Sequence, residues 1–85
     1  MGEHFDLELL SVEAKLLCGI NEMFDNEPWN VQSVRYQFAK LMDRLCVQRE
    51  NVGRSEAWRN FSIAITDLEN ACIRAIKWLY SIDIK

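Results

Sequence analysis

Apolar and polar residues follow a helical period along the chain, in three stretches separated by two short turns. The first predicted helix covers about residues 6–24, although Ser11 and Glu13 leave a later start open. Its apolar stripe contains Phe5, Leu9, Leu16, Ile20 and Met23. Gly19 weakens the middle of this helix by about 1 kcal/mol relative to alanine, and we expect it to permit a close contact.

The second predicted helix covers about residues 31–49. Pro28 ends the preceding helical pattern, and Asn30 is a suitable N-cap for the next helix. One face of this helix is apolar and is formed by Val31, Val34, Phe38, Leu41 and Leu45.

The third predicted helix covers about residues 55–80. Gly53 is expected to take the left-handed conformation in the turn before it, and Ser55 to be its N-cap. A heptad-spaced apolar stripe consists of Phe61, Ile65, Leu68, Cys72, Ala75 and Leu79. A second stripe is formed mostly by small residues, which would let another helix approach closely: Ala57, Ala64, Ala71 and Trp78.

Two arrangements would bury a third helix that is apolar on two sides. A three-helix bundle would bury both sides internally, whereas a hairpin of the second and third helices could also pack against other protomers. A single core in a chain of 85 residues supplies only about 3–5 kcal/mol, so oligomerisation is the expected source of further burial. We predict one all-α domain over residues 1–85, with an N-terminal helix packed on a long antiparallel helical hairpin, assembled as a homo-oligomer.

The composition is that of a folded protein, because 49 % of the residues are apolar. Cys18, Cys46 and Cys72 lie at apolar helix positions without a C-x-x-C spacing, so we expect buried, reduced thiols and no metal site. The chain has neither an apolar run of about 20 residues nor a basic N-terminal leader, which indicates a cytoplasmic protein without a membrane partner.

Charge is distributed unevenly along the chain. Seven acids and one base give residues 1–30 a net charge of −6, while nine bases and six acids give residues 31–85 a net charge of +3. The acidic first third would repel a long polyanion, so we expect no DNA binding. The basic remainder could hold a small anion, and an acidic face could pair with a basic face on a neighbouring copy.

Residue types that support catalysis are scarce. His4 is the one histidine, and the chain contains no phosphate-binding loop, dinucleotide fingerprint or H-E-x-x-H motif. We therefore expect a protein that is not an enzyme and needs no cofactor.

The most informative polar feature is a stripe on the third helix. Arg59, Ser62 and Thr66 follow at i, i+3 and i+7 and share one helix face, which would offer a guanidinium and two hydroxyls to phosphate or base edges. The alternative is a solvated face in which Arg59 pairs with Glu56 or with Asp67 of a neighbour.

The second helix carries another candidate surface. Tyr36, Lys40 and Arg44 lie at i, i+4 and i+8, which suits a stacked base with adjacent phosphates, although a solvated basic face is the more ordinary interpretation. Trp29 at the preceding turn could stack on a base or cover the end of the core.

Residues 59–71 read Arg-Asn-Phe-Ser-Ile-Ala-Ile-Thr-Asp-Leu-Glu-Asn-Ala. The pattern Arg-x-x-Ser-hydrophobic-Ala-x-Thr-x-Leu in this run resembles the second hairpin helix of the small phage proteins called anti-CBASS 2 and Thoeris anti-defence 1. Residues 41–45, Leu-Met-Asp-Arg-Leu, are similar to the Leu-Ile-Asp-x-Leu pattern of the preceding helix in that family. The resemblance covers about residues 31–80.

The resemblance implies a homohexameric nucleotide sponge, which binds cyclic nucleotide immune signals in the host bacterial cytoplasm without cleaving them. Arg59 would hold phosphates, and Ser62 and Thr66 would bond phosphate or base edges, in a pocket formed where three chains meet. A second family pocket takes cyclic dinucleotides or cyclic ADP-ribose derivatives and uses an early lysine and an N-terminal aromatic residue. Gln32 stands near that lysine position here, so this pocket is either lost or rebuilt from Arg35, Tyr36, Lys40 or Trp29.

The leading interpretation is therefore a phage anti-defence protein that sequesters a cyclic nucleotide. The alternative is a small helical inhibitor or adaptor that binds a host protein directly through its wide apolar surface and its acidic N-terminal region.

Overall fold

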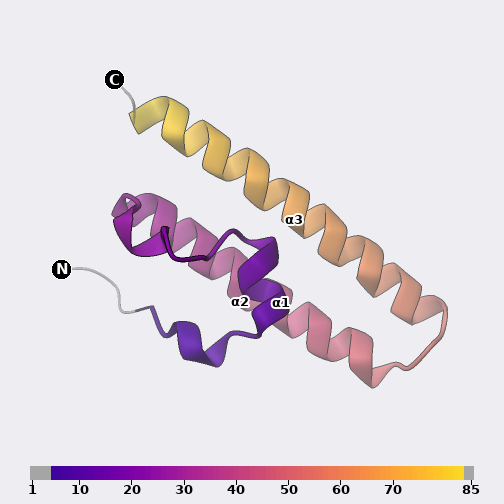
Figure 1. Ribbon diagram of the computed structural model, residues 1–85. Helices are drawn as coiled ribbons and strands as arrows, with labels where there is room; N and C mark the ends of the chain where they lie inside the picture. Colours follow the sequence, from indigo (N-terminus) through magenta and orange to yellow (C-terminus); the bar gives the residue numbers. More distant parts are fainter. Residues whose placement is uncertain (1–4, 84–85) are drawn as a thin grey trace.

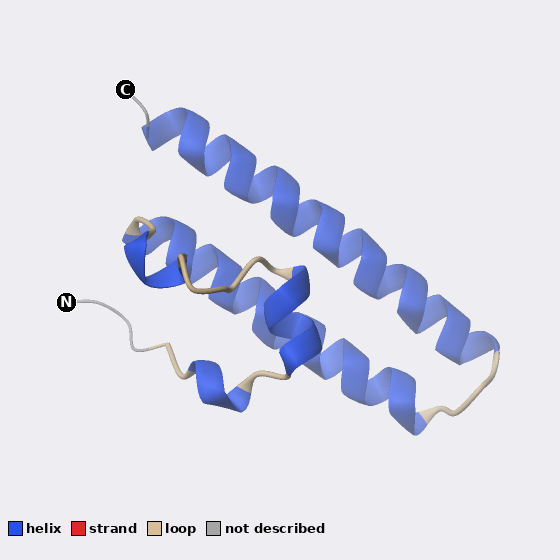
Figure 2. Cartoon of the chain, viewed as in Figure 1, coloured by secondary structure: helices blue, strands red, loops and turns tan. Residues whose placement is uncertain are grey.

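Two long antiparallel helices, α2 (Trp29–Asn51) and α3 (Glu56–Asp83), lie side by side and form a hairpin in the computed structural model, which describes residues 5–83 (Figures 1 and 2). α2 extends two residues beyond its predicted bounds at each end, whereas α3 begins one residue later and ends three residues later than predicted. Gly53 lies in the connecting turn with a φ of 67°, and the Ser55 Oγ atom accepts a hydrogen bond of 3.3 Å from the Trp58 amide. The predicted left-handed conformation of Gly53 and the predicted N-cap at Ser55 are thereby confirmed.

The N-terminal segment is the main departure from the predicted fold. The continuous helix expected over residues 6–24 is wrong, because the chain instead forms the 3-10 helix η1 (Leu7–Leu9), the short helix α1 (Val12–Leu17) and the 3-10 helix η2 (Phe24–Asn26). Ser11 starts α1, since its Oγ atom accepts a hydrogen bond of 3.1 Å from the Ala14 amide while Leu10 is extended.

Gly19 stops α1 rather than lying inside a helix. Its φ is 74°, and the amide of Ile20 reaches the carbonyl of Lys15 at 2.8 Å while the amide of Gly19 reaches that of Leu16 at 3.3 Å. These two bonds are the Schellman arrangement that closes a helix at a left-handed residue. The left-handed Gly19 and these two hydrogen bonds therefore end the helix, and the spacing of apolar residues alone does not predict that end.

The start of α2 also differs from the prediction. Pro28 occupies the N-cap position, with a φ of −57°, and its carbonyl accepts the Gln32 amide at 3.0 Å. Asn30, the N-cap that the sequence predicts, lies inside the first turn instead. The fixed φ of proline suits the beginning of a helix, so the residue expected to end the preceding pattern starts this one.

The core lies between α2 and its two neighbours, with the N-terminal segment on one side of α2 and α3 on the other (Figure 1). Met42 and Val31 are its largest fully buried side chains. The heptad stripe of α3 faces α2, with Ile65 and Cys72 buried, although Leu41 of the predicted α2 face is 48 % exposed. None of the helices within residues 5–83 combines the length and the apolar character that a bilayer span requires.

The second stripe of α3 stays uncovered within the described part of the chain. Ala57, Ala71 and Trp78 are exposed, Trp78 by 63 %, and Ala64 is half-buried. The N-terminal segment packs on α2 and not over this stripe, so the three-helix bundle that would bury both sides of α3 is not formed.

Candidate ligand-binding site

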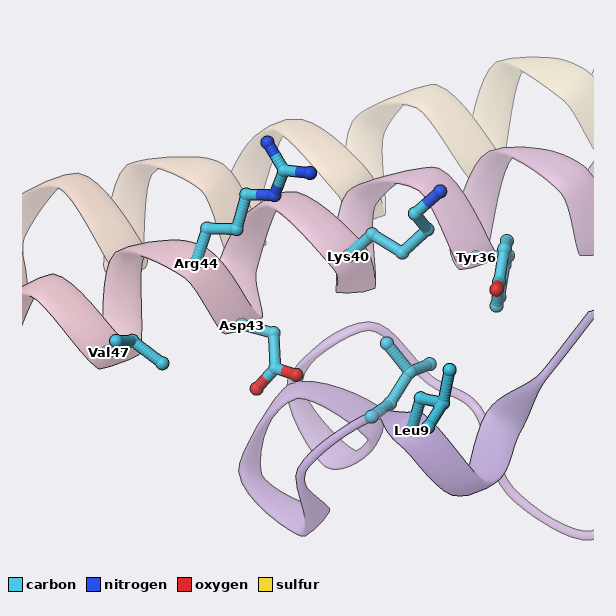
Figure 3. Close-up of a pocket in the computed structure, with 7 residues that line it drawn as sticks. Leu9, Tyr36, Lys40, Asp43, Arg44 and Val47 are labelled. Carbon is cyan, nitrogen blue, oxygen red and sulfur yellow. The ribbon is translucent and has the colours of Figure 1, made fainter.

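A hollow of about 210 Å³ lies where the N-terminal segment meets α2 (Figure 3). Tyr36, Lys40, Arg44 and Val47 follow one another by three or four residues, so they share one side of α2. The hollow is lined by Leu9, Leu10, Tyr36, Lys40, Asp43, Arg44 and Val47. The structure therefore brings together Tyr36, Lys40 and Arg44, which the sequence predicts to share one surface, and adds an apolar wall from the N-terminal segment.

Tyr36 forms a wall of this hollow rather than an open stacking platform. Its ring is 8 % exposed, lies 5.1 Å from the ring of Phe5 and has the Lys40 Nζ atom 5.4 Å from its centroid. Its hydroxyl accepts a hydrogen bond of 3.4 Å from the Asp6 amide. The contacts from Phe5 and Asp6 arise because the N-terminal segment folds back over α2, whereas Lys40 lies one turn from Tyr36 on α2 itself.

Three charged side chains surround the opening. Figure 3 shows Lys40 and Arg44 extending to the same side of α2, while the carboxylate of Asp43 is directed toward the N-terminal segment. Within residues 5–83, neither Asp43 nor Arg44 takes part in an ion pair or a side-chain hydrogen bond. Two cations and one carboxylate thus remain available to a ligand that has both an anionic group and hydrogen-bond donors.

The predicted stripe of α3 lies away from this hollow. Arg59 and Thr66 are exposed, and in the described part of the chain no ion pair or hydrogen bond engages the Arg59 guanidinium. Thr66 donates its hydroxyl to the Ser62 carbonyl at 3.2 Å. The Ser62 Oγ atom is shielded from solvent and, among residues 5–83, has no hydrogen-bond partner. The stripe therefore offers a free guanidinium, whereas neighbouring side chains would have to shift before a ligand could reach Ser62.

Arg35 has a structural role. Its Nε and Nη2 atoms donate to the two carboxylate oxygens of Glu27 at 2.7 and 2.8 Å, and its Nη1 atom donates to the Cys18 carbonyl at 3.0 Å. The Tyr80 hydroxyl donates to the same carboxylate at 2.8 Å. This polar cluster of Glu27, Arg35 and Tyr80 joins the N-terminal segment, α2 and the end of α3.

The polar cluster shifts the ionisation of its members. Burial acts to raise the pKa of Glu27, but the hydrogen bonds from Arg35 and Tyr80 outweigh it and lower that pKa below its usual value. The hydrogen bond to Glu27 raises the pKa of Arg35 and also that of Tyr80. Arg35 is consequently a fixed cation held by its partner rather than a free phosphate ligand.

The remaining predicted residues lie outside the hollow. Trp29 is the first residue of α2, is 54 % exposed and does not line the hollow. The three cysteines are buried free thiols, as predicted, and Cys72 Sγ approaches the Cys18 carbonyl at 3.9 Å. In the described range, no three histidine, cysteine or acidic residues are grouped to hold a metal ion, and His4 lies outside that range.

Sequence reasoning missed four lining residues, namely Asp43, Val47, Leu9 and Leu10. Asp43 follows Lys40 by three positions on α2, so helical spacing could have placed it beside the cations. The two leucines carried no such signal, because they were assigned to a straight helix.

The fold and the hollow define a small all-helical protein built on a helical hairpin, with an N-terminal segment that completes a charged hollow. No protein-family model, curated protein or solved structure matches the chain.

Proposed function

We propose that this protein is a phage anti-defence protein that binds a cyclic nucleotide immune signal as a homo-oligomer and withholds it from its receptor without cleaving it. The observation that carries the proposal is the hollow on α2, which combines apolar walls with two neighbouring cations. A nucleotide has the matching parts, namely a flat base for the apolar walls and phosphates for Lys40 and Arg44.

Arg59 supports the same proposal from α3. Its guanidinium is exposed and unpaired among residues 5–83, and it stands at the start of the Arg-x-x-Ser-x-x-x-Thr run that resembles the sponge family. A cation near the axis of an assembly would meet its copies from other chains, and several guanidiniums together would hold a compact polyanion such as a cyclic trinucleotide.

The uncovered stripe of α3 supports self-association. Ala57 and Ala71 would let a second helix come close, and Trp78 would supply a large apolar side chain near the far end. Burial of this stripe between copies would add to the limited core of a chain of this length.

Isothermal titration calorimetry with cyclic dinucleotides, cyclic trinucleotides and cyclic ADP-ribose isomers tests this proposal. We expect at least one ligand to bind with a Kd below about 1 μM and to be recovered intact after the protein is denatured by heat. Failure of the whole panel to bind, or recovery of a cleaved product, would contradict the proposal.

Two variants separate the candidate surfaces. Lys40→Gln should weaken a ligand held at the hollow, and Arg59→Ala should weaken one held at α3, each by about tenfold or more for a lost charge-assisted contact. Arg74→Ala removes an exposed cation from the outer side of α3 and serves as the matched control. Equal affinity in all three variants would show that neither surface binds the ligand.

A second candidate function is the direct binding of a host protein. Leu9, Val12 and Leu16 are 75, 70 and 72 % exposed on the N-terminal segment. The acidic side chains of Glu8 and Glu13 are exposed near them in the sequence, although Glu13 already pairs with Arg49 at 3.1 Å. An apolar ridge beside acids suits a partner with a basic rim. Sedimentation equilibrium discriminates the candidates, since a hexamer favours the sponge and a monomer favours the adaptor.

A further inference from the structure

We propose that Asp43 makes the hollow on α2 selective for guanine over adenine. This inference rests on the proposed function and names the base that the site would favour. It is carried by one juxtaposition, because the unpaired Asp43 carboxylate lines the same hollow as the apolar side chains Leu9 and Leu10 and the cations Lys40 and Arg44.

The volume of the hollow limits what it can hold. About 210 Å³ is smaller than the roughly 300–1,000 Å³ of pockets that enclose whole drug-sized ligands. One base fits such a space, while the sugar and phosphates of a cyclic dinucleotide would stay outside. Figure 3 shows Lys40 and Arg44 extending from α2 away from the N-terminal segment, and phosphates outside the hollow would lie beside them.

Asp43 supplies the polar recognition inside this arrangement. Its carboxylate is directed toward the N-terminal segment in Figure 3, and in the described part of the chain no cation neutralises it. A carboxylate accepts hydrogen bonds and donates none while it is ionised. Between two phosphate-binding cations, a free carboxylate would only repel the ligand unless the base offers it hydrogen-bond donors.

Guanine and adenine differ at the edge that would face this carboxylate. Guanine carries N1–H and an exocyclic N2 amine side by side, which can donate two parallel hydrogen bonds to the two carboxylate oxygens. Adenine has an acceptor at N1, which a carboxylate repels, and a single neighbouring amine. A well-placed bidentate pair discriminates strongly between bases, so we expect at least tenfold selectivity.

The test compares the affinity of the intact protein for cyclic di-GMP and cyclic di-AMP by calorimetry. We expect cyclic di-GMP to bind at least tenfold more tightly. Asp43→Asn should reduce this ratio to below about threefold, because the amide has one acceptor oxygen and its nitrogen opposes the guanine amine. Asp67→Asn removes an exposed carboxylate from α3 and should leave the ratio unchanged.

The outcomes distinguish this inference from the proposed function. Binding of cyclic di-AMP, or of a cyclic ADP-ribose isomer alone, without a guanine preference would overturn the role of Asp43 and leave nucleotide binding in place. An undiminished preference in Asp43→Asn, with the fold verified by circular dichroism, would overturn it as well. A panel in which no cyclic nucleotide binds would overturn both.

Discussion

Replacement of Glu27 by glutamine tests whether the polar cluster holds the N-terminal segment on the hairpin. The Glu27 side chain is 13 % exposed and accepts three hydrogen bonds of 2.7–2.8 Å, two from Arg35 and one from Tyr80. Glu27→Gln keeps the shape and one acceptor oxygen but removes the charge that pairs with Arg35.

The structure sets the expected magnitude. Removing one member of a buried ion pair costs about 3–5 kcal/mol, and a hydrogen bond to a charged group contributes about 1.5–3 kcal/mol. Because glutamine still accepts one bond and Arg35 keeps its bond to the Cys18 carbonyl, we expect Glu27→Gln to lower the free energy of unfolding by about 2–3 kcal/mol. That is a large part of the stability of a small domain.

Urea unfolding followed by far-ultraviolet circular dichroism measures this difference, at one fixed protein concentration because self-association would shift the midpoint. The matched control is Glu50→Gln, since Glu50 is 72 % exposed and lies 3.6 Å from Arg49 Nε. This surface pair should contribute no more than about 0.5 kcal/mol. A loss in Glu27→Gln as small as that of the control would refute the reasoning.

Three further predictions follow from particular contacts. The lowered pKa of Glu27 contributes stability that is present above 4.5, the pKa in the unfolded state, and is lost as the pH falls through the pKa of the folded state. The difference in unfolding free energy between the parent and Glu27→Gln should therefore shrink as the pH falls. A constant difference from pH 7 to pH 3 would contradict this. Gly19→Ala should lower the free energy of unfolding in urea by about 1 kcal/mol more than Gly53→Ala. Both glycines have a positive φ, but only at Gly19 would a Cβ atom collide with the Arg35 guanidinium. Equal losses in the two variants would oppose this account. Burial raises the pKa of Cys46 to about 11, so at pH 8 iodoacetamide should alkylate this thiol much more slowly than the thiol of an unfolded chain. Peptide mass spectrometry follows the labelling, and equally fast labelling of the two thiols would contradict this prediction.

The hairpin could be predicted from the sequence because its signals are local and agree with one another. The heptad stripe of α3, the N-cap at Ser55 and the left-handed Gly53 all point to one arrangement, and the structure has each of them. The bounds differ by only a few residues, as expected where helix ends fray.

The N-terminal segment could not be predicted in the same way, because its apolar spacing also fits a helix. Ser11 carries the signal that starts the shorter helix α1 and Gly19 the signal that stops it, but the periodic apolar stripe favours one continuous helix. The position of Arg35 shows a different limit. Glu27 lies 8 residues from Arg35 along the chain, and Tyr80 lies 53 residues from Glu27, so spacing on α2 alone suggests a free cation.

The hollow on α2 contains some residues that the sequence predicts and others that it does not. Helical spacing placed Tyr36, Lys40 and Arg44 together, whereas its leucine wall depends on how the N-terminal segment folds back over α2. The burial of Tyr36 follows from the same fold-back, so the sequence indicated the charged rim of the site and not its closed wall.

Native mass spectrometry of the protein mixed with the cyclic nucleotide panel tests the central claim most directly, because it reports the assembly and its ligand in one spectrum. We predict a homo-oligomer, a hexamer if the family resemblance holds, that carries ligand of unchanged mass. A monomer without ligand across the whole panel, or a ligand whose mass shows cleavage, would contradict the account.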